Sequence, residues 1–248
     1  MIGNFAKYGE KLKIETNYTV KERSDLLSLI PSNFEINSIL ELGCADGKNL
    51  IYFKNFFNID YKNTIGIDLC ESITNKYDDF IFFHSSIEEF LKKNKKKFDL
   101  ILFSDVLEHI YNPWDCLRRI HDHMNSNGLI LLSVPNMQNI KYIQSFANGN
   151  FFYQDTGLFD QTHIRFFSSE TLTKYVEESN FKIISKGWRP DQSMQGLKNQ
   201  ILNQLAGKVD IELKTQFFSL RINKNNIENY FGQQILICAQ KNGGDGET

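Results

Sequence analysis

The stretch Ile39-Leu-Glu-Leu-Gly-Cys-Ala-Asp-Gly47 is a short apolar run followed by a turn with a glycine at each end. An amphipathic segment over residues 48–57 follows directly. This is the pattern of a strand, a tight turn and a helix, in which glycine lets the backbone approach a ligand and the helix N-terminus offers free N–H groups. The G-x-G-x-x-G spacing of dinucleotide-binding folds is absent. The stretch therefore predicts a ligand-binding turn of another kind.

The alternation of apolar runs and amphipathic segments continues along the chain. Strands are predicted over 38–42, 64–68, 80–83, 98–104, 129–134, 181–185 and 234–239, and helices over 48–57, 87–93 and 114–124 and after a cap at Ser168. Strands that alternate with helices form βαβ units with a parallel sheet and helices on both faces. The sequence therefore predicts an α/β fold.

Three segments flank or interrupt this pattern. Residues 1–37 are polar and aromatic, with one helical stretch that stops at Pro31, and are predicted to form an N-terminal helical cover. Residues 188–231 separate the last two strands and are too long for a hairpin turn, so we expect an insertion that acts as a lid. The main domain is then 38–240, and the tail 241–248 is expected to be disordered.

Composition narrows the class of protein. Hydrophobic residues make up 41% and charged residues 23% of the 248 residues, with a net charge of -2, as in ordinary globular proteins. We expect no general electrostatic binding of nucleic acid, no targeting segment and no membrane span. The four cysteines are scattered, which favours reduced thiols and a cytoplasmic location.

Asp68 ends the strand predicted over 64–68. In a parallel sheet this position lies at the same edge as the turn after the first strand, and a carboxylate there can accept hydrogen bonds from both hydroxyls of a ribose. Together, the glycine turn and Asp68 predict an adenosine site.

Four motifs in this order resemble the class I S-adenosylmethionine-dependent methyltransferases. They are the turn 41–47, Asp68, the stretch Phe98-Asp-Leu-Ile-Leu-Phe-Ser-Asp-Val-Leu-Glu-His109, and the stretch Asn127-Gly-Leu-Ile-Leu-Leu-Ser-Val-Pro-Asn136. The resemblance implies a Rossmann-like seven-stranded, mostly parallel sheet with helices on both faces and an antiparallel last strand. It also implies methyl transfer with S-adenosylmethionine as cofactor.

The resemblance assigns a set of residues to the cofactor. Glu41 would lie beneath the turn, and Tyr18 of the N-terminal cover would reach the cofactor carboxylate. The remaining cofactor residues, from the methionine part through the ribose and adenine to the sulfonium end, would be Gly43, Cys44, Ala45, Gly47, Asp68, Leu69, Ser86, Ile87, Ser104 and Asp105. Ser86 stands where many family members have an aspartate for the adenine amino group.

Asp105, Glu108 and His109 follow the fourth predicted strand at helical spacing, so their side chains are expected to share one face. One hypothesis makes His109 the general base that takes a proton from the acceptor. Another, by resemblance to ubiquinone-biosynthesis-type O-methyltransferases, makes these residues and His163 a divalent metal site. A third has Glu108 and His109 only order the local turn. The sequence assigns no metal ligands.

The stretch Asp155-Thr-Gly-Leu-Phe-Asp-Gln-Thr-His-Ile-Arg-Phe-Phe167 is similar to a segment of methyltransferases found in cell-surface polysaccharide pathways. The similarity implies a loop over the acceptor, with His163 as a second candidate base and Arg165 as a ligand for a phosphate or carboxylate. The alternative is that Arg165 pairs with Asp155 or Asp160 to hold the loop closed.

These observations predict methyl transfer to an oxygen, rather than a nitrogen, of a small polar acceptor. The acceptor would be a sugar, a nucleotide-linked sugar or a phosphorylated precursor of capsule or O-antigen. The alternative is a cofactor-binding module without turnover that partners another enzyme.

Overall fold

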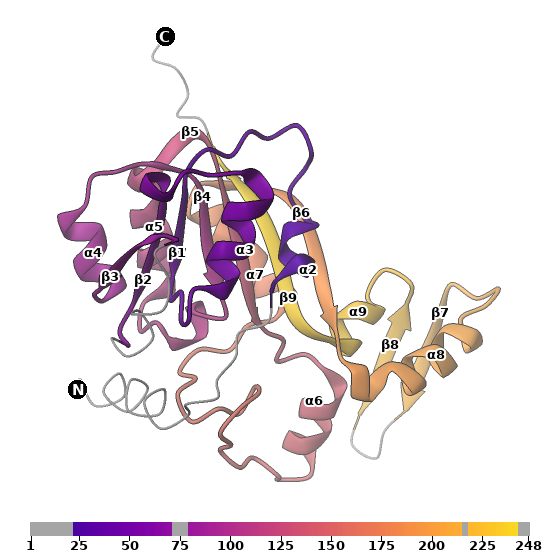
Figure 1. Ribbon diagram of the computed structural model, residues 1–248. Coiled ribbons are helices and arrows are strands. Elements are labelled where there is room, and N and C mark those ends of the chain that lie inside the picture. Colours follow the sequence, from indigo (N-terminus) through magenta and orange to yellow (C-terminus); the bar gives the residue numbers. More distant parts are fainter. Residues whose placement is uncertain (1–21, 71–78, 215–217, 243–248) are drawn as a thin grey trace.

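The computed structural model describes residues 22–70, 79–214 and 218–242 (Figure 1). Within these residues, seven strands form one sheet in the order β3-β2-β1-β4-β5-β9-β6. The strands are β1 (Ile39–Leu42), β2 (Thr64–Asp68), β3 (Ile81–His84), β4 (Phe98–Ser104), β5 (Met124–Pro135), β6 (Phe181–Pro190) and β9 (Gly232–Lys241). β9 pairs antiparallel with both β5 and β6, while the pairs among the other strands are parallel. The predicted mostly parallel sheet with an antiparallel last strand is confirmed.

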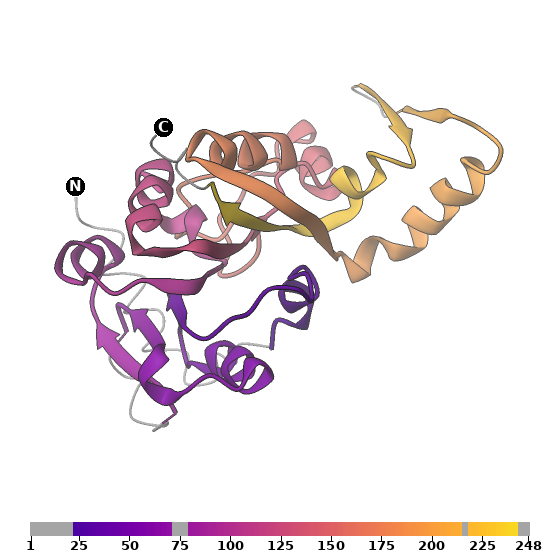
Figure 2. The ribbon, with the colours of Figure 1, turned by 90° about the horizontal axis from the view of Figure 1, so that it is seen from above.

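Helices cover both faces of the sheet. Successive residues of a strand point to opposite faces, and in the central strands the residues on both faces are apolar and pack against helices. In β4, Ile101 and Phe103 pack in a cluster with residues of α4, α5 and α7, whereas Leu100 and Leu102 pack in a second cluster with residues of α2 and α3. The helices are α2 (Ser24–Leu27), α3 (Lys48–Phe57), α4 (Ile87–Lys93), α5 (Pro113–Ile120) and α7 (Ser169–Glu178). Figure 2 shows the sheet between these two layers.

One of the predicted helices ends earlier than expected, and another forms as expected. The helix expected over 114–124 ends at Ile120, because a 3-10 turn over His121–His123 leads directly into β5. The helix expected after Ser168 forms with a capping box, in which Ser168 and Thr171 each bond the other's backbone N–H.

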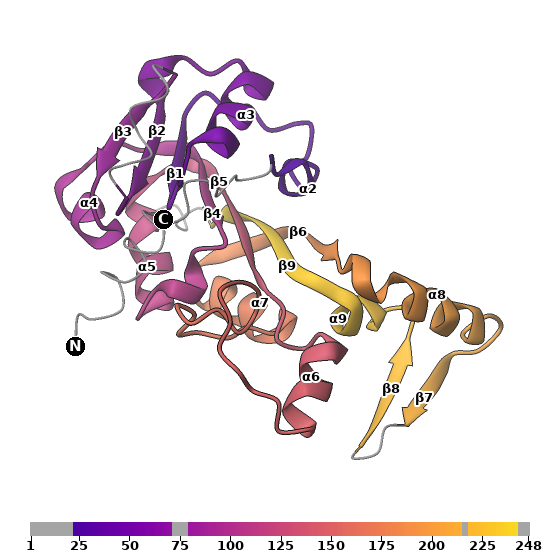
Figure 3. The same cartoon turned by 60° about the horizontal axis from the view of Figure 1, so that its bottom comes forward.

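The insertion is shorter than predicted, because β6 continues to Pro190. It contains α8 (Gln195–Gln204), the hairpin of β7 (Asp210–Lys214) and β8 (Ser219–Asn223), and α9 (Ile227–Phe231). These elements and α6 (Ile140–Ala147) share a separate small core, which includes the buried side chains of Ile140, Leu205 and Phe231. Figures 1 and 3 show this unit beside α6, on the side of the sheet away from β3. The hairpin and α6 were not predicted.

The N-terminal cover is described from residue 22 onward, where α2 packs against the sheet through Leu26 and Leu27. Tyr18 lies outside the described residues. Lys241 of the predicted tail belongs to β9, and residues 243–248 lie outside the described part. Among the described residues, no helix combines the length and the apolar character needed to cross a bilayer.

Candidate functional site

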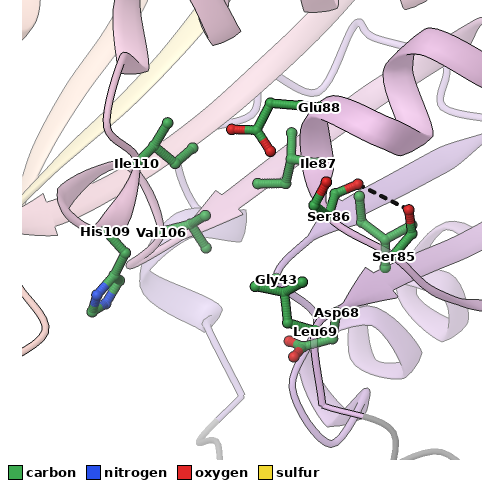
Figure 4. Close-up of a pocket in the computed structure, with 11 residues that line it drawn as sticks. Gly43, Asp68, Leu69, Ser85, Ser86, Ile87, Glu88, Val106, His109 and Ile110 are labelled. Atoms are coloured by element: carbon green, nitrogen blue, oxygen red, sulfur yellow. Dashed lines mark hydrogen bonds between the residues drawn. The ribbon is translucent and has the colours of Figure 1, made fainter. Parts of the chain in front are cut away.

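A cavity of about 280 Å³ lies at the carboxyl ends of β1, β2 and β4 (Figure 4). Its lining residues are Gly43, Ile67, Asp68, Leu69, Ser85, Ser86, Ile87, Glu88, Val106, His109 and Ile110. The sequence predicts six of these eleven residues and misses five, which are Ile67, Ser85, Glu88, Val106 and Ile110. Val106 and Ile110 were missed because they flank a 3-10 turn, which has no apolar periodicity. Among the described residues, none from 191–231 lines the cavity, and the role of the insertion as a lid stays a prediction.

Asp68 fixes the geometry of the turn above it. Its Oδ2 accepts the backbone N–H of Ala45 at 2.8 Å, and its Oδ1 accepts that of Cys70 at 2.9 Å. Burial raises the pKa of Asp68 despite these two donors. Each carboxylate oxygen has a second acceptor position. Asp68 therefore holds the turn and has acceptor positions left for a ligand's hydroxyl groups, and its role in holding a ribose stays a prediction.

Gly43 is needed where it stands for two reasons. Its φ is 72°, in the left-handed region, and an added Cβ would lie 2.7 Å from Cγ2 of Val106. Because Val106 lines the cavity and β4 is next to β1, a side chain at Gly43 would push against the cavity wall. The close approach that the structure shows at Gly43 is to Val106, and the predicted approach to a ligand stays a prediction.

Cys44, Ala45 and Gly47 are outside the cavity lining. Cys44 is buried against Gly66 of β2, and a Cβ on Gly47 would lie 2.4 Å from the ring of Phe80. Ala45 has a φ of 45°, in the left-handed region. A left-handed alanine costs about 1–2 kcal/mol, and the hydrogen bond from Ala45 to Asp68 offsets part of that cost.

The far wall of the cavity comes from β2 and α4. Leu69 and Ile87 give it an apolar surface, and their contact with the adenine stays a prediction. The hydroxyl of Ser86 accepts the N–H of Glu89 at 3.1 Å and so caps α4. Ser86 is therefore a cavity residue whose hydroxyl already has a structural hydrogen bond.

Beneath the turn, Glu41 is fully buried. Its Oε1 accepts Nδ2 of Asn49 at 2.6 Å, and the same amide donates to Oγ of Ser104 at 3.1 Å. Burial raises the pKa of Glu41 to about 8, so this side chain is protonated at neutral pH. The prediction that Glu41 lies under the turn agrees with this position.

The predicted shared face of Asp105, Glu108 and His109 is wrong. Asp105 has a φ of 58°, and the helix is a single 3-10 turn over Leu107–His109, so the helical register does not form. The Asp105 carboxylate instead accepts hydrogen bonds from Arg23 at 3.2 Å, Ser133 at 2.7 Å and Gln234 at 2.7 Å.

Arg23 was placed by the sequence only in the N-terminal cover, yet it is 3% exposed and lies at the centre of this network. It bonds both oxygens of Asp25 as well as Asp105. Its backbone N–H donates to Oδ1 of Asn49 at 3.2 Å. A charged residue near a predicted helix start carries no sequence signal for such burial.

Glu108, His109 and His163 come together although 53 residues separate the two histidines in sequence. The ring centroids of His109 and His163 are 4.7 Å apart, and Nε2 of His163 is 4.0 Å from Oε1 of Glu108. One ligand atom from each of the three side chains lies within 4.8 Å of the others. Both predicted catalytic histidines are therefore in one cluster, and His109 also lines the cavity.

Backbone hydrogen bonds hold this cluster together. The N–H groups of Ile164 and Arg165 donate to the carbonyl oxygen of Glu108 at 2.9 and 3.0 Å. Burial, with the nearby charge of His163, lowers the pKa of His109 to about 4. Burial also raises the pKa of Glu108 well above its ordinary value. At neutral pH, His109 is thus a neutral imidazole with a lone pair, which can accept a proton or bind a cation.

Arg165 does not point into the cavity. Its guanidinium donates to the carbonyl oxygens of Ile164 and Tyr111, and its Cζ lies 5.1 Å from the ring centroid of Tyr111 and 5.6 Å from that of Trp114. These contacts join the loop that carries His163 to the segment after His109. They do not support Arg165 as a phosphate or carboxylate ligand, and they replace the alternative pairing with Asp155 or Asp160.

Comparison with known proteins relates this chain to methyltransferases. A family profile described as a methyltransferase domain matches residues 15–186. An uncharacterized protein of Haemophilus influenzae is 28% identical over 144 residues, which are 52% of this chain and 55% of that protein. The aligned region thus spans about half the length of that relative.

Two solved structures share the architecture. A SAM-dependent methyltransferase from Archaeoglobus fulgidus is 19% identical with a TM-score of 0.59, over 88% of this chain and 92% of that chain. The N-methyltransferase NodS from Bradyrhizobium japonicum, solved with S-adenosyl-L-homocysteine, is 11% identical with a TM-score of 0.52, over 96% and 98%. At these identities the similarity concerns the fold.

Proposed function

From the premise that the chain belongs to the family of methyltransferase domains and takes S-adenosylmethionine as its methyl donor, we propose that it methylates an oxygen of a small polar acceptor. In this reaction the methyl carbon passes from the sulfonium to the acceptor oxygen and the hydroxyl proton is released. The products are the methyl ether or ester and S-adenosylhomocysteine. The electrophile is supplied by the donor, so the residues of the chain bind, align and activate.

The cavity residues fit this donor. The Asp68 carboxylate suits the two ribose hydroxyls, and the apolar surface of Leu69 and Ile87 suits the adenine ring. Gly43 lines the cavity without a side chain, and we propose that its backbone contacts the methionine part. We propose these residues as the donor-binding set.

The position of His109 is the observation that most favours an oxygen acceptor. A hydroxyl group is a poor nucleophile until it loses its proton, and His109 presents a neutral imidazole at the cavity wall, beside His163. We propose these two histidines as the residues that activate the acceptor, either by accepting its proton or by holding a cation to which the oxygen binds.

For the acceptor we propose a sugar, a nucleotide-linked sugar or a phosphorylated sugar precursor of capsule or O-antigen. The similarity of residues 155–167 to a segment of methyltransferases from polysaccharide pathways supports this class. The four cysteines are buried and form no disulfide with one another, which suits a reducing cytoplasm; they are Cys44, Cys70, Cys116 and Cys238.

The test is S-adenosylhomocysteine release on a panel of free, nucleotide-linked and phosphorylated sugars, with His109→Asn and His163→Asn as variants. His121→Asn is the matched control, because His121 lies on the 3-10 turn before β5. We expect turnover on one class of sugar, loss in the first two variants and full activity in the control. Donor binding by calorimetry without turnover on any hydroxyl acceptor would refute oxygen transfer and favour a binding module.

A further inference from the structure

Three aromatic side chains lie exposed beside one another on α6 and on the segment that follows it. Phe146 of α6 is 43% exposed and stacks on Phe151, which is 38% exposed, with ring centroids 5.2 Å apart and planes at 18°. Tyr153 is 66% exposed, and its ring centroid is 5.4 Å from that of Phe151. Single apolar side chains are common on a protein surface, whereas a group of exposed rings indicates a binding partner. We call these three residues the aromatic platform.

The platform is held in place from below and by its backbone. The ring of Phe159 is 4% exposed and packs edge-on against Phe146 at 5.2 Å and against Phe151 at 4.9 Å. The N–H of Gln154 donates to the carbonyl oxygen of Phe159 at 2.8 Å, and the N–H of Gln161 donates to that of Gln154 at 3.0 Å. The rings are therefore ordered before a ligand arrives, which lowers the entropy cost of binding.

The segment that carries the platform is uncharged. Residues 142–154 contain no Asp, Glu, Lys, Arg or His. At its two ends, Lys141 pairs with Asp191 at 2.6 Å, and Asp155 accepts Nε2 of Gln161 at 3.3 Å. Four exposed side chains of the segment are amides, namely Gln144, Asn148, Asn150 and Gln154. A nucleic acid or an acidic membrane surface requires basic side chains, so this segment suits a neutral ligand that has both apolar faces and hydrogen-bonding groups.

A sugar ring combines these properties. The C–H groups on one face of a pyranose carry a small positive charge and pack on the negative face of an aromatic ring. Its hydroxyl groups donate to and accept from amide side chains. Because the platform has several rings, linked sugar units can contact different rings at the same time.

The platform also lies close to the candidate catalytic histidines. Figure 1 shows α6 and the segment after it below the carboxyl ends of the strands, which is the edge of the sheet that carries the cavity. Phe159, which supports the platform, follows Leu158, and the carbonyl oxygen of Leu158 is 2.9 Å from Nδ1 of His163. A ligand longer than one sugar unit can therefore contact the platform while another of its units reaches the histidines.

We propose that Phe146, Phe151 and Tyr153 bind neutral sugar units of an oligosaccharide. This binding site makes the acceptor a chain of linked sugars, of which the platform holds the units that are not methylated. The identity of the bound chain as the acceptor rests on the proposed function. The binding of neutral sugars by the platform does not, and it is measured without methyl transfer.

The test is the binding of three neutral trisaccharides, maltotriose, cellotriose and triacetylchitotriose, to the full-length protein, by saturation-transfer NMR and calorimetry. Trigalacturonate serves as a charged counterpart. Tyr153→Ala and Phe146→Ala each remove one ring, whereas Tyr153→Phe keeps the ring. Phe152→Ala is the matched control, because Phe152 is 69% exposed and, within the described part of the chain, makes no ring contact with the platform. S-adenosylhomocysteine affinity on the same samples shows that each variant is folded.

We expect at least one neutral trisaccharide to bind. Its Kd should rise by about tenfold in Tyr153→Ala and Phe146→Ala and stay within about twofold in Tyr153→Phe and Phe152→Ala. Binding of none of the three, tighter binding of trigalacturonate, or an equal loss in Phe152→Ala would overturn the platform as a neutral-sugar site. Self-association that Tyr153→Ala abolishes would assign the surface to a second copy of the chain instead.

The outcomes also separate this site from the proposed function. Trisaccharide binding that Tyr153→Ala weakens, in a protein that methylates no hydroxyl acceptor, would support the platform and refute oxygen transfer. Methyl transfer to a sugar at a rate and a KM that Tyr153→Ala leaves unchanged would support oxygen transfer and overturn the platform as part of the acceptor site.

Discussion

Replacing Asp68 by asparagine separates the two tasks that the structure gives to its carboxylate. The two oxygens accept N–H groups from Ala45 and Cys70, at 2.8 and 2.9 Å. Asparagine has one acceptor oxygen, and its NH₂ group would face the other N–H donor. One backbone N–H is then left without a partner, and the substituted side chain is also a weaker acceptor for a ribose.

The size of both effects follows from these bonds. An unsatisfied buried N–H costs about 1–3 kcal/mol of stability, and loss of a charge-assisted hydrogen bond to the ribose costs about 1.5–3 kcal/mol of binding free energy. The second figure corresponds to a rise of roughly 10- to 100-fold in the Kd for S-adenosylhomocysteine. Asp68→Asn should therefore be less stable and bind the cofactor product more weakly.

Asp99 supplies a matched control. It lies at the opposite end of β4 from the cavity, where its Oδ2 accepts the backbone N–H of Asn37 and the hydroxyl of Ser38, and its Oδ1 accepts Nδ2 of Asn125. Asp99→Asn loses one of these acceptors too, so we expect a similar loss of stability. Its affinity for S-adenosylhomocysteine should not change.

The assay is calorimetric titration of each variant with S-adenosylhomocysteine, beside denaturant unfolding. A Kd of Asp68→Asn within twofold of the unsubstituted protein would refute the ribose role, whatever happens to stability. An equal loss of affinity in Asp99→Asn would show that the effect is a general consequence of destabilisation.

Three further predictions address the rest of the fold. Burial raises the pKa of Glu41 to about 8 from an ordinary 4.5, so the folded chain keeps a proton that the unfolded chain loses as the pH rises. The contribution of Glu41 to the unfolding free energy therefore falls by about 1 kcal/mol per pH unit between about pH 5 and 8. Urea unfolding of Glu41→Gln should show a flatter pH dependence than that of the unsubstituted protein. Gly43→Ala places a Cβ 2.7 Å from Val106 at a φ of 72°. It should lower the free energy of unfolding by about 1–2 kcal/mol, measured by thermal unfolding, and weaken cofactor binding. An unchanged calorimetric affinity would contradict the proposed contact between the Gly43 backbone and the cofactor. Leu205→Ala empties a fully buried position in the small core and should cost about 2–5 kcal/mol locally, seen as faster hydrogen exchange in α8 and β8 with unchanged cofactor affinity.

The sheet was predictable because its signals are local. Each core strand is a short apolar run, and the alternation with helices leaves few ways to arrange them. The hairpin of β7 and β8 was missed because it has no such local signal. Its residues are partly exposed and polar, and their burial depends on α8 and α9. The pattern of apolar residues within β7 or β8 gives no sign of this packing on α8 and α9.

The cofactor side of the site was predictable and the polar network beneath it was not. Asp68 and Gly43 lie at strand ends, where topology alone brings them together. Arg23, Ser133 and Gln234 meet Asp105 from three distant segments. Such a contact depends on how side chains pack across β5 and β9, and Asp105 was placed wrongly because its left-handed backbone ends the helical register assumed for it.

Glu108 shows where the requirements of the fold and of the site separate. The loop that carries His163 is fastened to the backbone of Glu108, through the N–H groups of Ile164 and Arg165, and any residue type offers that carbonyl oxygen. The side chain adds no hydrogen bond within the described chain, and its burial costs free energy that a leucine or methionine at the same position would not. Packing therefore gives no reason for a carboxylate beside the two imidazoles, so Glu108 meets a requirement of the site rather than one of the fold.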